Sequence, residues 1–142
     1  MTNANQATLM KLGDSDLTVA DPAEDVRGRK VLDANGDEVG DVEDLMVDDR
    51  EIKVRFLQVG TGGFLGIGET KFLVPVDAIT SIDGDHVHID QSREHVAGAP
   101  TYEPDMSFDD TYYNSLYGYW GYAPYWGMGY AYPAYPYYAT RR

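Results

Sequence analysis

Short apolar runs separated by turn residues occupy the chain between residues 25 and 90. The first run is centred on Val31 and is followed by Asn35-Gly36. This dipeptide suits a two-residue hairpin turn, because both residues tolerate the positive φ that the turn requires. The pattern therefore predicts a β-hairpin whose second strand runs from about residue 38 to residue 47.

The second strand of this hairpin has an irregular hydrophobic phase. Its apolar residues are spaced as on one face of a helix, at Val39, Val42, Leu45 and Met46. Gly40 and the flanking turn signals disfavour a helix. A β-bulge near Glu43 and Asp44 restores the inward phase of a strand, because a bulge inserts one extra residue. We therefore predict a bulged strand.

Further strands are expected at residues 52–59, 71–74, 80–83 and 86–90. In the first of these, Lys53 and Arg55 alternate with apolar residues, which predicts that both point away from the core. Pro75 ends the next strand because proline cannot donate to the ladder. One helical turn is expected at Val76–Ile79, and Ser92 is expected to cap a short helix.

Composition divides the chain into a polar acidic arm at residues 1–24, a domain at 25–103 and a tail at 104–142 that is rich in Tyr, Trp, Gly and Pro. Leu17 and Val19 are the expected contacts of the arm. The tail keeps neither helical nor strand periodicity, so we expect it to be disordered. The predicted fold is all-β: a small barrel of about six short strands, with a polar N-terminal arm and a disordered aromatic C-terminal tail.

Charge and cysteine content restrict the partners. The net charge of −13 repels phosphate backbones, so duplex nucleic acid is not expected and a basic protein is favoured. The alternative is that the charge only maintains solubility. The absence of cysteine excludes disulfides and thiol chemistry. The N-terminus has no signal-peptide pattern, and no apolar run approaches the ~20 residues of a membrane span, so a soluble cytoplasmic protein is expected.

Two patterns suggest a metal, and each has a simpler interpretation. Residues 33–44 match a calcium loop only in part, because Gly36 comes two positions early and Asp44 stands where the final Glu belongs. A plain turn is the better interpretation. His86, His88 and Asp90 alternate on one strand face at ~7 Å spacing and are weak candidates for zinc or copper. The alternative is an exposed polar face, and we assign no metal and no cofactor.

Carboxylates are frequent on the second and third strands, at Asp41, Glu43, Asp44, Asp48, Asp49 and Glu51. Paired carboxylates act in acid–base catalysis only where a cleft perturbs their pKa values. A domain of this size does not promise such a cleft, so a solvated face is expected. No serine–histidine–acid motif is present. The sequence therefore predicts that the protein is not an enzyme and has no catalytic residue.

Two segments offer apolar contacts to a partner. The glycine-rich loop at residues 60–69 lacks a nucleotide-phosphate motif, and its apolar residues Phe64, Leu65 and Ile67 either fold back on the barrel or form a mobile flap. The aromatic tail, with Trp120 and Trp126, either binds a partner or itself, or covers an apolar surface of the barrel, or has no specific role. Single-stranded nucleic acid is disfavoured because the tail lacks a basic groove.

The ordered set of these segments resembles the PRC-barrel domain, which is named for the H subunit of the photosynthetic reaction centre. The matching segments are Val26–Val31, the Asn35-Gly36 turn, Val39–Asp48, Phe64–Gly68, Phe72–Val76, Val87–Asp90 and Ser92–Pro100. The whole chain is similar to stand-alone bacterial proteins of this type. The resemblance implies a protein-binding adaptor. It does not carry over the specific role of the H subunit, whose membrane anchor has no counterpart here, or that of ribosome maturation factors, whose N-terminal half is missing.

We therefore predict a non-enzymatic protein–protein interaction module, with a homodimer or larger oligomer as an option. The expected partner contacts are Asp41, Glu43, Asp44, Phe64, Leu65, Ile67, Trp120 and Trp126. One alternative is a structural or stress-related protein that self-assembles through the aromatic tail. A further alternative is a metal-binding module at His86 and His88.

Overall fold

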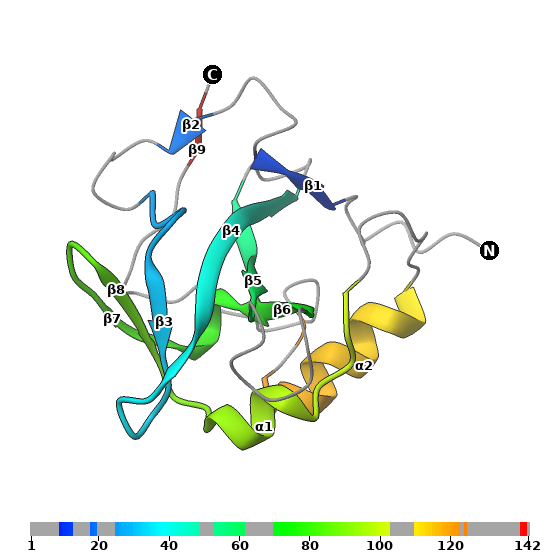
Figure 1. Cartoon of the computed structure of the whole chain (residues 1–142). Coiled ribbons are helices and arrows are strands. Elements are labelled where there is room, and N and C mark those ends of the chain that lie inside the picture. Colours follow the sequence, from blue (N-terminus) through cyan, green and yellow to red (C-terminus); the bar gives the residue numbers. More distant parts are fainter. Residues whose placement is uncertain are drawn as a thin grey trace.

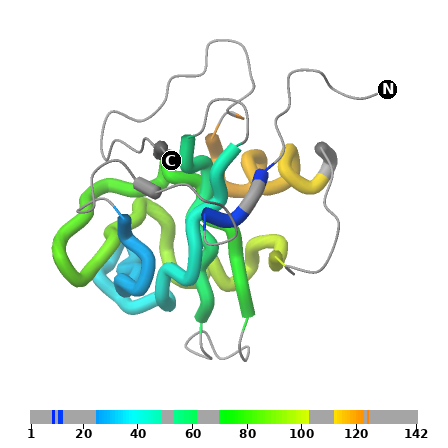
Figure 2. The backbone as a smooth tube through the Cα atoms, turned by 90° about the horizontal axis from the view of Figure 1, so that it is seen from above, coloured from blue at the N-terminus to red at the C-terminus, as the bar shows by residue number. Residues whose placement is uncertain are grey.

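The computed structural model describes residues 9–12, 18–19, 25–48, 53–61, 70–102, 110–122, 124 and 140–141. Within them, a seven-stranded sheet curls around a single apolar core (Figures 1 and 2). The strand order is β6-β5-β4-β3-β8-β7, with β1 paired to β4 off this path. The predicted all-β class and small barrel are confirmed. The barrel is open, because its edge strands β6 and β7 do not pair with each other.

For most of the domain, the strands and helices occur in the order predicted from the sequence. The strands are β1 (Leu9–Lys11), β2 (Thr18–Val19), β3 (Lys30–Leu32), β4 (Glu38–Asp48), β5 (Val54–Gly60), β6 (Lys71–Pro75), β7 (Ile79–Ile82), β8 (His86–Ile89) and β9 (Thr140–Arg141). The helices are the 3₁₀ turn η3 (Val76–Ala78), α1 (Arg93–Ala97) and α2 (Asp110–Trp120). β2 and β9 form a separate two-stranded sheet.

The long strand β4 holds the sheet together. It pairs antiparallel with β3 and β1 along one side and with β5 along the other. Its register against β5 shifts between Val42 and Asp44, so Glu43 is the extra residue of a bulge. The predicted bulge is confirmed, and it lets an 11-residue strand bend around the core.

The turn between β3 and β4 is longer than the predicted two-residue hairpin. Asp33 accepts a backbone hydrogen bond from Gly36, whose φ is 85°, and donates one to Asp37. The buried Asp33 carboxylate also accepts from the backbone N–H groups of Asn35 and Asp37 at 2.8 Å each, and from that of Arg93 at 2.8 Å. Both carboxylate oxygens are thus occupied by backbone donors, which supports a turn in preference to a calcium loop.

Three local predictions in the second half of the domain are confirmed. Pro75 is the last residue of β6, and η3 follows it directly. The hydroxyl of Ser92 accepts a hydrogen bond from the backbone N–H of His95 at 3.1 Å and so caps α1.

The core contradicts one prediction from strand alternation. Every residue of β5 is buried, including Arg55, which was expected to point to solvent. Arg55 and Asp48 form an ion pair with a 2.6 Å distance between Nε and Oδ2, and neither side chain is more than 2% exposed. Asp48 was expected on a solvated face, so that prediction is also wrong. Alternation fails here because both faces of β5 are covered.

The arm packs on the domain through β1 and Leu12. β1 adds to β4, and Leu12 is buried in the core. Leu17 lies outside the described residues, and Val19 pairs through its backbone with Thr140 of β9. The arm thus contributes a strand to the main sheet.

The prediction of disorder beyond Pro104 is wrong for α2. This helix lies beside α1 at one end of the sheet, and Leu116, Tyr117 and Trp120 are buried in the core (Figure 1). Periodicity arguments missed it because the partly exposed aromatic residues Tyr112 and Tyr119 lie beside and between the buried positions and obscure the helical stripe. Among the described residues, no helix has the length and apolar character needed to cross a membrane.

The close approach of β4 and β5 gives a first testable prediction. A Cβ on Gly40 would lie 2.2 Å from the backbone oxygen of Gly60, so Gly40→Ala requires a backbone shift. We expect Gly40→Ala to lower the free energy of unfolding by roughly 1–3 kcal/mol in urea denaturation. Gly84→Ala is the matched control, because a Cβ there meets nothing within 4 Å. Equal stability of the two variants would contradict the packing described.

Candidate interaction surface

The bulge in β4 brings Glu43 to the surface. As the extra residue of the bulge, Glu43 has no partner on β5, and its side chain crosses over that strand. Its Oε1 accepts hydrogen bonds from Gln58 of β5 at 3.0 Å and from Lys71 of β6 at 2.6 Å. The carboxylate passes directly over Gly60, where a Cβ would lie 2.0 Å from Oε2. Glycine at position 60 therefore makes the space that this carboxylate occupies.

The Glu43 carboxyl is held in its ionised form. Burial opposes ionisation, but the hydrogen bonds from Lys71 and Gln58 outweigh this effect, so the pKa of Glu43 lies below its usual value. The side chains of Glu43 and Lys71 are each 31% exposed. This carboxylate is therefore charged at neutral pH and within reach of solvent.

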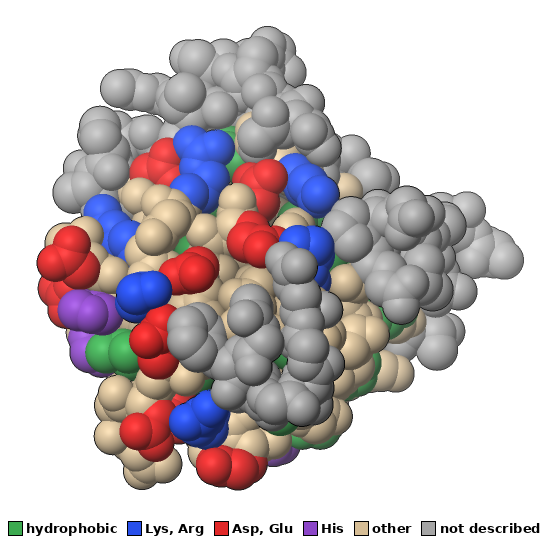
Figure 3. Space-filling view, viewed as in Figure 1, with side chains coloured by type: hydrophobic (Ala, Val, Ile, Leu, Met, Phe, Trp, Pro, Cys, Tyr) green, Lys and Arg blue, Asp and Glu red, His purple; other side chains and the backbone are tan. Residues whose placement is uncertain are grey.

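Two other carboxylates of β4 lie close to Glu43 in the chain. Asp41 is half exposed and forms an ion pair with Lys30 at 3.3 Å. Lys30 also pairs with Glu38 at 3.1 Å. Asp44 is partly buried, and its Oδ1 accepts from the backbone N–H of Leu45 at 2.8 Å. Acidic and basic side chains are accordingly intermixed on the face of Figure 3, rather than forming one acidic patch.

The predicted apolar contacts are placed only in part. Phe64, Leu65, Ile67 and Trp126 lie outside the described residues. Trp120 is 3% exposed, and its Nε1 donates to the backbone oxygen of Leu73 at 3.0 Å. Trp120 therefore contacts the protein's own core and is not part of the surface described here.

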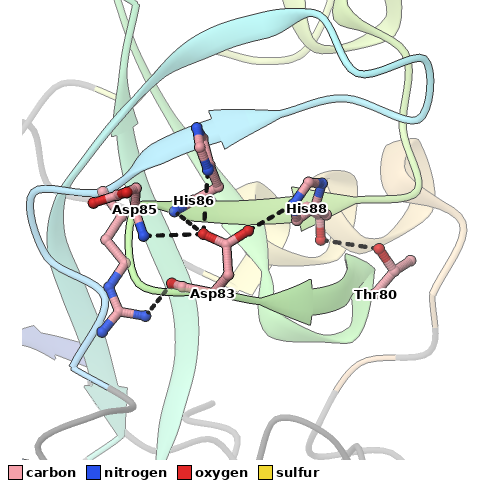
Figure 4. Close-up of polar contacts among 6 residues, drawn as sticks. Thr80, Asp83, Asp85, His86 and His88 are labelled. Carbon is pink, nitrogen blue, oxygen red and sulfur yellow. Dashed lines mark hydrogen bonds and ion pairs between the residues drawn. The ribbon is translucent and has the colours of Figure 1, made fainter.

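A second polar cluster lies on the β7–β8 hairpin. The side chain of Asp83 lies between the rings of His86 and His88 (Figure 4). Its Oδ1 is 3.1 Å from Nδ1 of His86, and its Oδ2 is 3.3 Å from Nε2 of His88. Oδ1 also accepts from the backbone N–H groups of Asp85 at 2.9 Å and His86 at 2.8 Å. Asp83 thus closes the turn and orients both imidazoles.

The carboxylate that contacts both histidines is Asp83, which the sequence pattern did not single out. Asp90, the predicted third member, instead accepts hydrogen bonds from the hydroxyl of Tyr122 and from Nε2 of Gln91. Among the described residues, no group of three His, Cys, Asp or Glu side chains could hold a metal ion. Asp83 could have been found from the sequence, because Asp followed by Gly commonly closes a turn with its carboxylate.

The hydrogen bonds to Asp83 strongly lower the pKa of its carboxyl group. The backbone N–H of Asp85 is the largest cause, and the imidazoles of His88 and His86 add to it, so the pKa of Asp83 falls to about 2. Asp83 is exposed at the surface, and His86 and His88 are partly exposed. The charged Asp83 carboxylate therefore stabilises the β7–β8 hairpin. The cluster does not form an acid–base pair in a cleft.

A hollow of about 540 Å³ lies between the β3–β4 turn and the β7–β8 hairpin, where Asp33, Thr80, His88 and Asp90 contribute to its lining. Both of its carboxylates are engaged: Asp33 by three backbone N–H groups, and Asp90 by Tyr122 and Gln91. The hydroxyl of Thr80 is bonded to the backbone oxygen of His88. The hollow thus lacks an available acid–base pair among these groups.

Together, the open barrel and its exposed carboxylates define a small β module with a charged outer face. The family model of the PRC-barrel domain matches residues 19–96. The chain therefore belongs to the PRC-barrel family. No curated protein matches the chain.

The low pKa of Asp83 predicts how acid affects stability. Because its pKa in the folded protein lies below the usual Asp value, ionised Asp83 stabilises the fold above about pH 4, and this stabilisation is lost as the pH falls towards 2. We expect Asp83→Asn to lower the melting temperature at neutral pH and to flatten its decline between these pH values. Thermal melts followed by circular dichroism test this.

Asp85→Asn serves as the control for this measurement. It neutralises an adjacent exposed carboxylate, whereas the hydrogen bonds that close the turn are accepted by Asp83. Asp85→Asn should therefore keep the acid dependence of the wild type. If the Asp83→Asn and wild-type curves ran parallel from neutral pH to pH 2, the assigned role of Asp83 would be wrong.

Proposed function

We propose that this protein is a non-enzymatic protein-interaction module that meets a basic partner through the carboxylates of β4. The observation that carries the proposal is the bulge that brings Glu43 to the surface beside Asp41 and Asp44. Membership of the PRC-barrel family supports a module without catalysis of its own. The net charge of −13 favours basic partners.

The lysines that pair with these carboxylates do not preclude such a contact. The pairs of Lys30 with Asp41 and of Lys71 with Glu43 are partly exposed. Ion pairs of this kind contribute only ~0–1 kcal/mol, because water screens them and ordering two long side chains costs entropy. A lysine or arginine of a partner can therefore replace or share them at little cost.

The apolar loop residues Phe64, Leu65 and Ile67 extend this proposal. We propose them as the apolar part of the same contact, because their segment joins β5 to β6, the strands that carry Gln58 and Lys71. An apolar contact beside a charged one would give affinity as well as orientation. A cytoplasmic location and a domain-level relation to the reaction-centre H subunit remain part of the proposal.

The alternatives receive less support. Self-assembly through exposed aromatic residues of the tail gains no support from Leu116, Tyr117 and Trp120, because these side chains are buried within the chain. A metal-binding module at His86 and His88 is weakened because Asp83 engages both imidazoles.

Charge removal tests the proposed surface. We expect the double variant Asp41→Asn/Glu43→Gln to weaken capture of basic proteins about ten-fold, because two exposed charge contacts are lost. Quantitative pulldown at about 0.1 M and about 1 M salt measures this, and wild-type capture should fall at the higher salt. Glu94→Gln, an exposed carboxylate on α1, is the matched control and should bind as the wild type. If the amount of captured protein changed neither with salt nor in the double variant, this surface would be ruled out.

A further inference from the structure

The helix α2 packs against an apolar groove of the barrel. Phe56 of β5 contacts two rings of α2, with centroid distances of 5.1 Å to Tyr117 and 6.1 Å to Tyr113. Leu116, Tyr117 and Trp120 are each at most 3% exposed. The buried residues of α2 thus recur at the spacing by which an amphipathic helix lies in a groove.

Directional hydrogen bonds fix α2 in this position. Nε1 of Trp120 donates to the backbone oxygen of Leu73 on the edge strand β6. The hydroxyl of Tyr119 donates to the backbone oxygen of His95 at 2.5 Å, and the His95 ring stacks on that of Tyr119 at 4.2 Å. Nε2 of His95 in turn lies 3.0 Å from the backbone oxygen of Tyr119. The groove therefore recognises aromatic side chains that carry polar tips.

The groove also lies along an otherwise open edge of the sheet. The outer oxygens of Lys71 and Leu73 on β6 accept from the backbone N–H of Tyr102 and from Trp120, respectively. Pro75 has no N–H to offer at this edge. Removal of α2 would thus expose both apolar side chains and an unpaired backbone oxygen.

The sequence of α2 favours a helix only weakly. It spans 11 residues and includes Thr111, Asn114, Ser115 and Gly118, all of which are weaker helix formers than alanine. A helix of this length is marginal in water even with an ideal sequence. We conclude that α2 folds because it docks, so docking and helix formation are coupled.

The groove and the helix differ in their relation to the family. Phe56, Leu73 and His95, which contact α2, all lie within the matched residues 19–96, whereas α2 lies beyond them. The groove is thus built by the family domain, and its ligand is an appended segment. Every copy of the chain carries both.

We propose that the groove formed by Phe56, Leu73 and His95 is a helix-docking site that accepts α2 from a second copy of this chain as well as its own. Reciprocal exchange satisfies both grooves and closes a two-fold symmetric pair. Within one chain α2 competes at an effective concentration in the ~mM range, so exchange increases when the internal docking is weakened. This site is separate from the carboxylates of β4.

A labelled peptide of residues 108–124 tests whether the groove is exchangeable. The full-length variant Tyr119→Phe/Trp120→Phe keeps an aromatic ring at each position but loses two hydrogen bonds of the internal helix. We expect fluorescence anisotropy to show at least ten-fold tighter peptide binding to this variant than to the wild type. A peptide with Gly118→Ala should bind a further ~5-fold more tightly, because position 118 is exposed and alanine favours the helix. A peptide with Tyr117→Asp should not bind.

Complementation between full-length chains tests exchange itself. His95→Ala weakens the groove of one chain, because it removes the ring that stacks on Tyr119 and lies against its backbone oxygen, while its α2 stays intact. Tyr117→Asp disables α2 of the other chain but leaves its groove intact. Circular dichroism should show that both keep the β-sheet signal of the wild type. We expect a heterodimer on mixing, detected by sedimentation, and monomers of each variant alone.

Two results would overturn the proposal. Equal peptide binding by the wild type and the Tyr119→Phe/Trp120→Phe variant would show that α2 does not occupy an exchangeable site. A mixture of the complementary chains that remains monomeric up to about millimolar concentration would exclude exchange between copies. Neither result depends on the salt response of the β4 carboxylates, so this proposal and the proposed function can fail independently.

Discussion

The bend of β4 is the constraint on which the rest of the structure depends. β4 pairs with β1, β3 and β5, so it must follow the curvature of the whole sheet. Two features allow this: Gly40, whose lack of a Cβ admits the backbone of β5, and the extra residue Glu43 in the bulge. The same bulge that curls the sheet also turns a carboxylate outward over Gly60. Core geometry and surface charge are therefore linked through one short segment of chain.

Local chemistry made much of the fold predictable from sequence. The bulge at Glu43, the end of β6 at Pro75 and the cap at Ser92 each depend on residues within a few positions of one another. Alternation failed at Arg55 because an outward position on one strand can be covered by another part of the chain. The helix α2 was missed for a related reason. Its order depends on contacts with β5, β6 and α1 that the local sequence does not encode.

The candidate surface was predictable at the level of single residues only. Asp41, Glu43 and Asp44 were expected as exposed carboxylates, but their partners Lys30 and Lys71 come from other strands. Spacing likewise suggested that His86, His88 and Asp90 share a face. In the structure both histidines contact Asp83, because the tight turn brings the Asp83 carboxylate close to the two rings. Which side chains meet across a turn depends on its geometry, which composition does not specify.

The parallel pairing of β3 with β8 has a consequence for how the barrel assembles. β3 to β6 join neighbours through short or moderate connections, and β7 and β8 form a hairpin of their own. The two pieces meet at a seam where Arg29 bonds to Asp83, 54 residues away. Closing so long a loop costs chain entropy before the seam contacts compensate for it. The seam is therefore expected to form late, after the N-terminal piece has paired during synthesis.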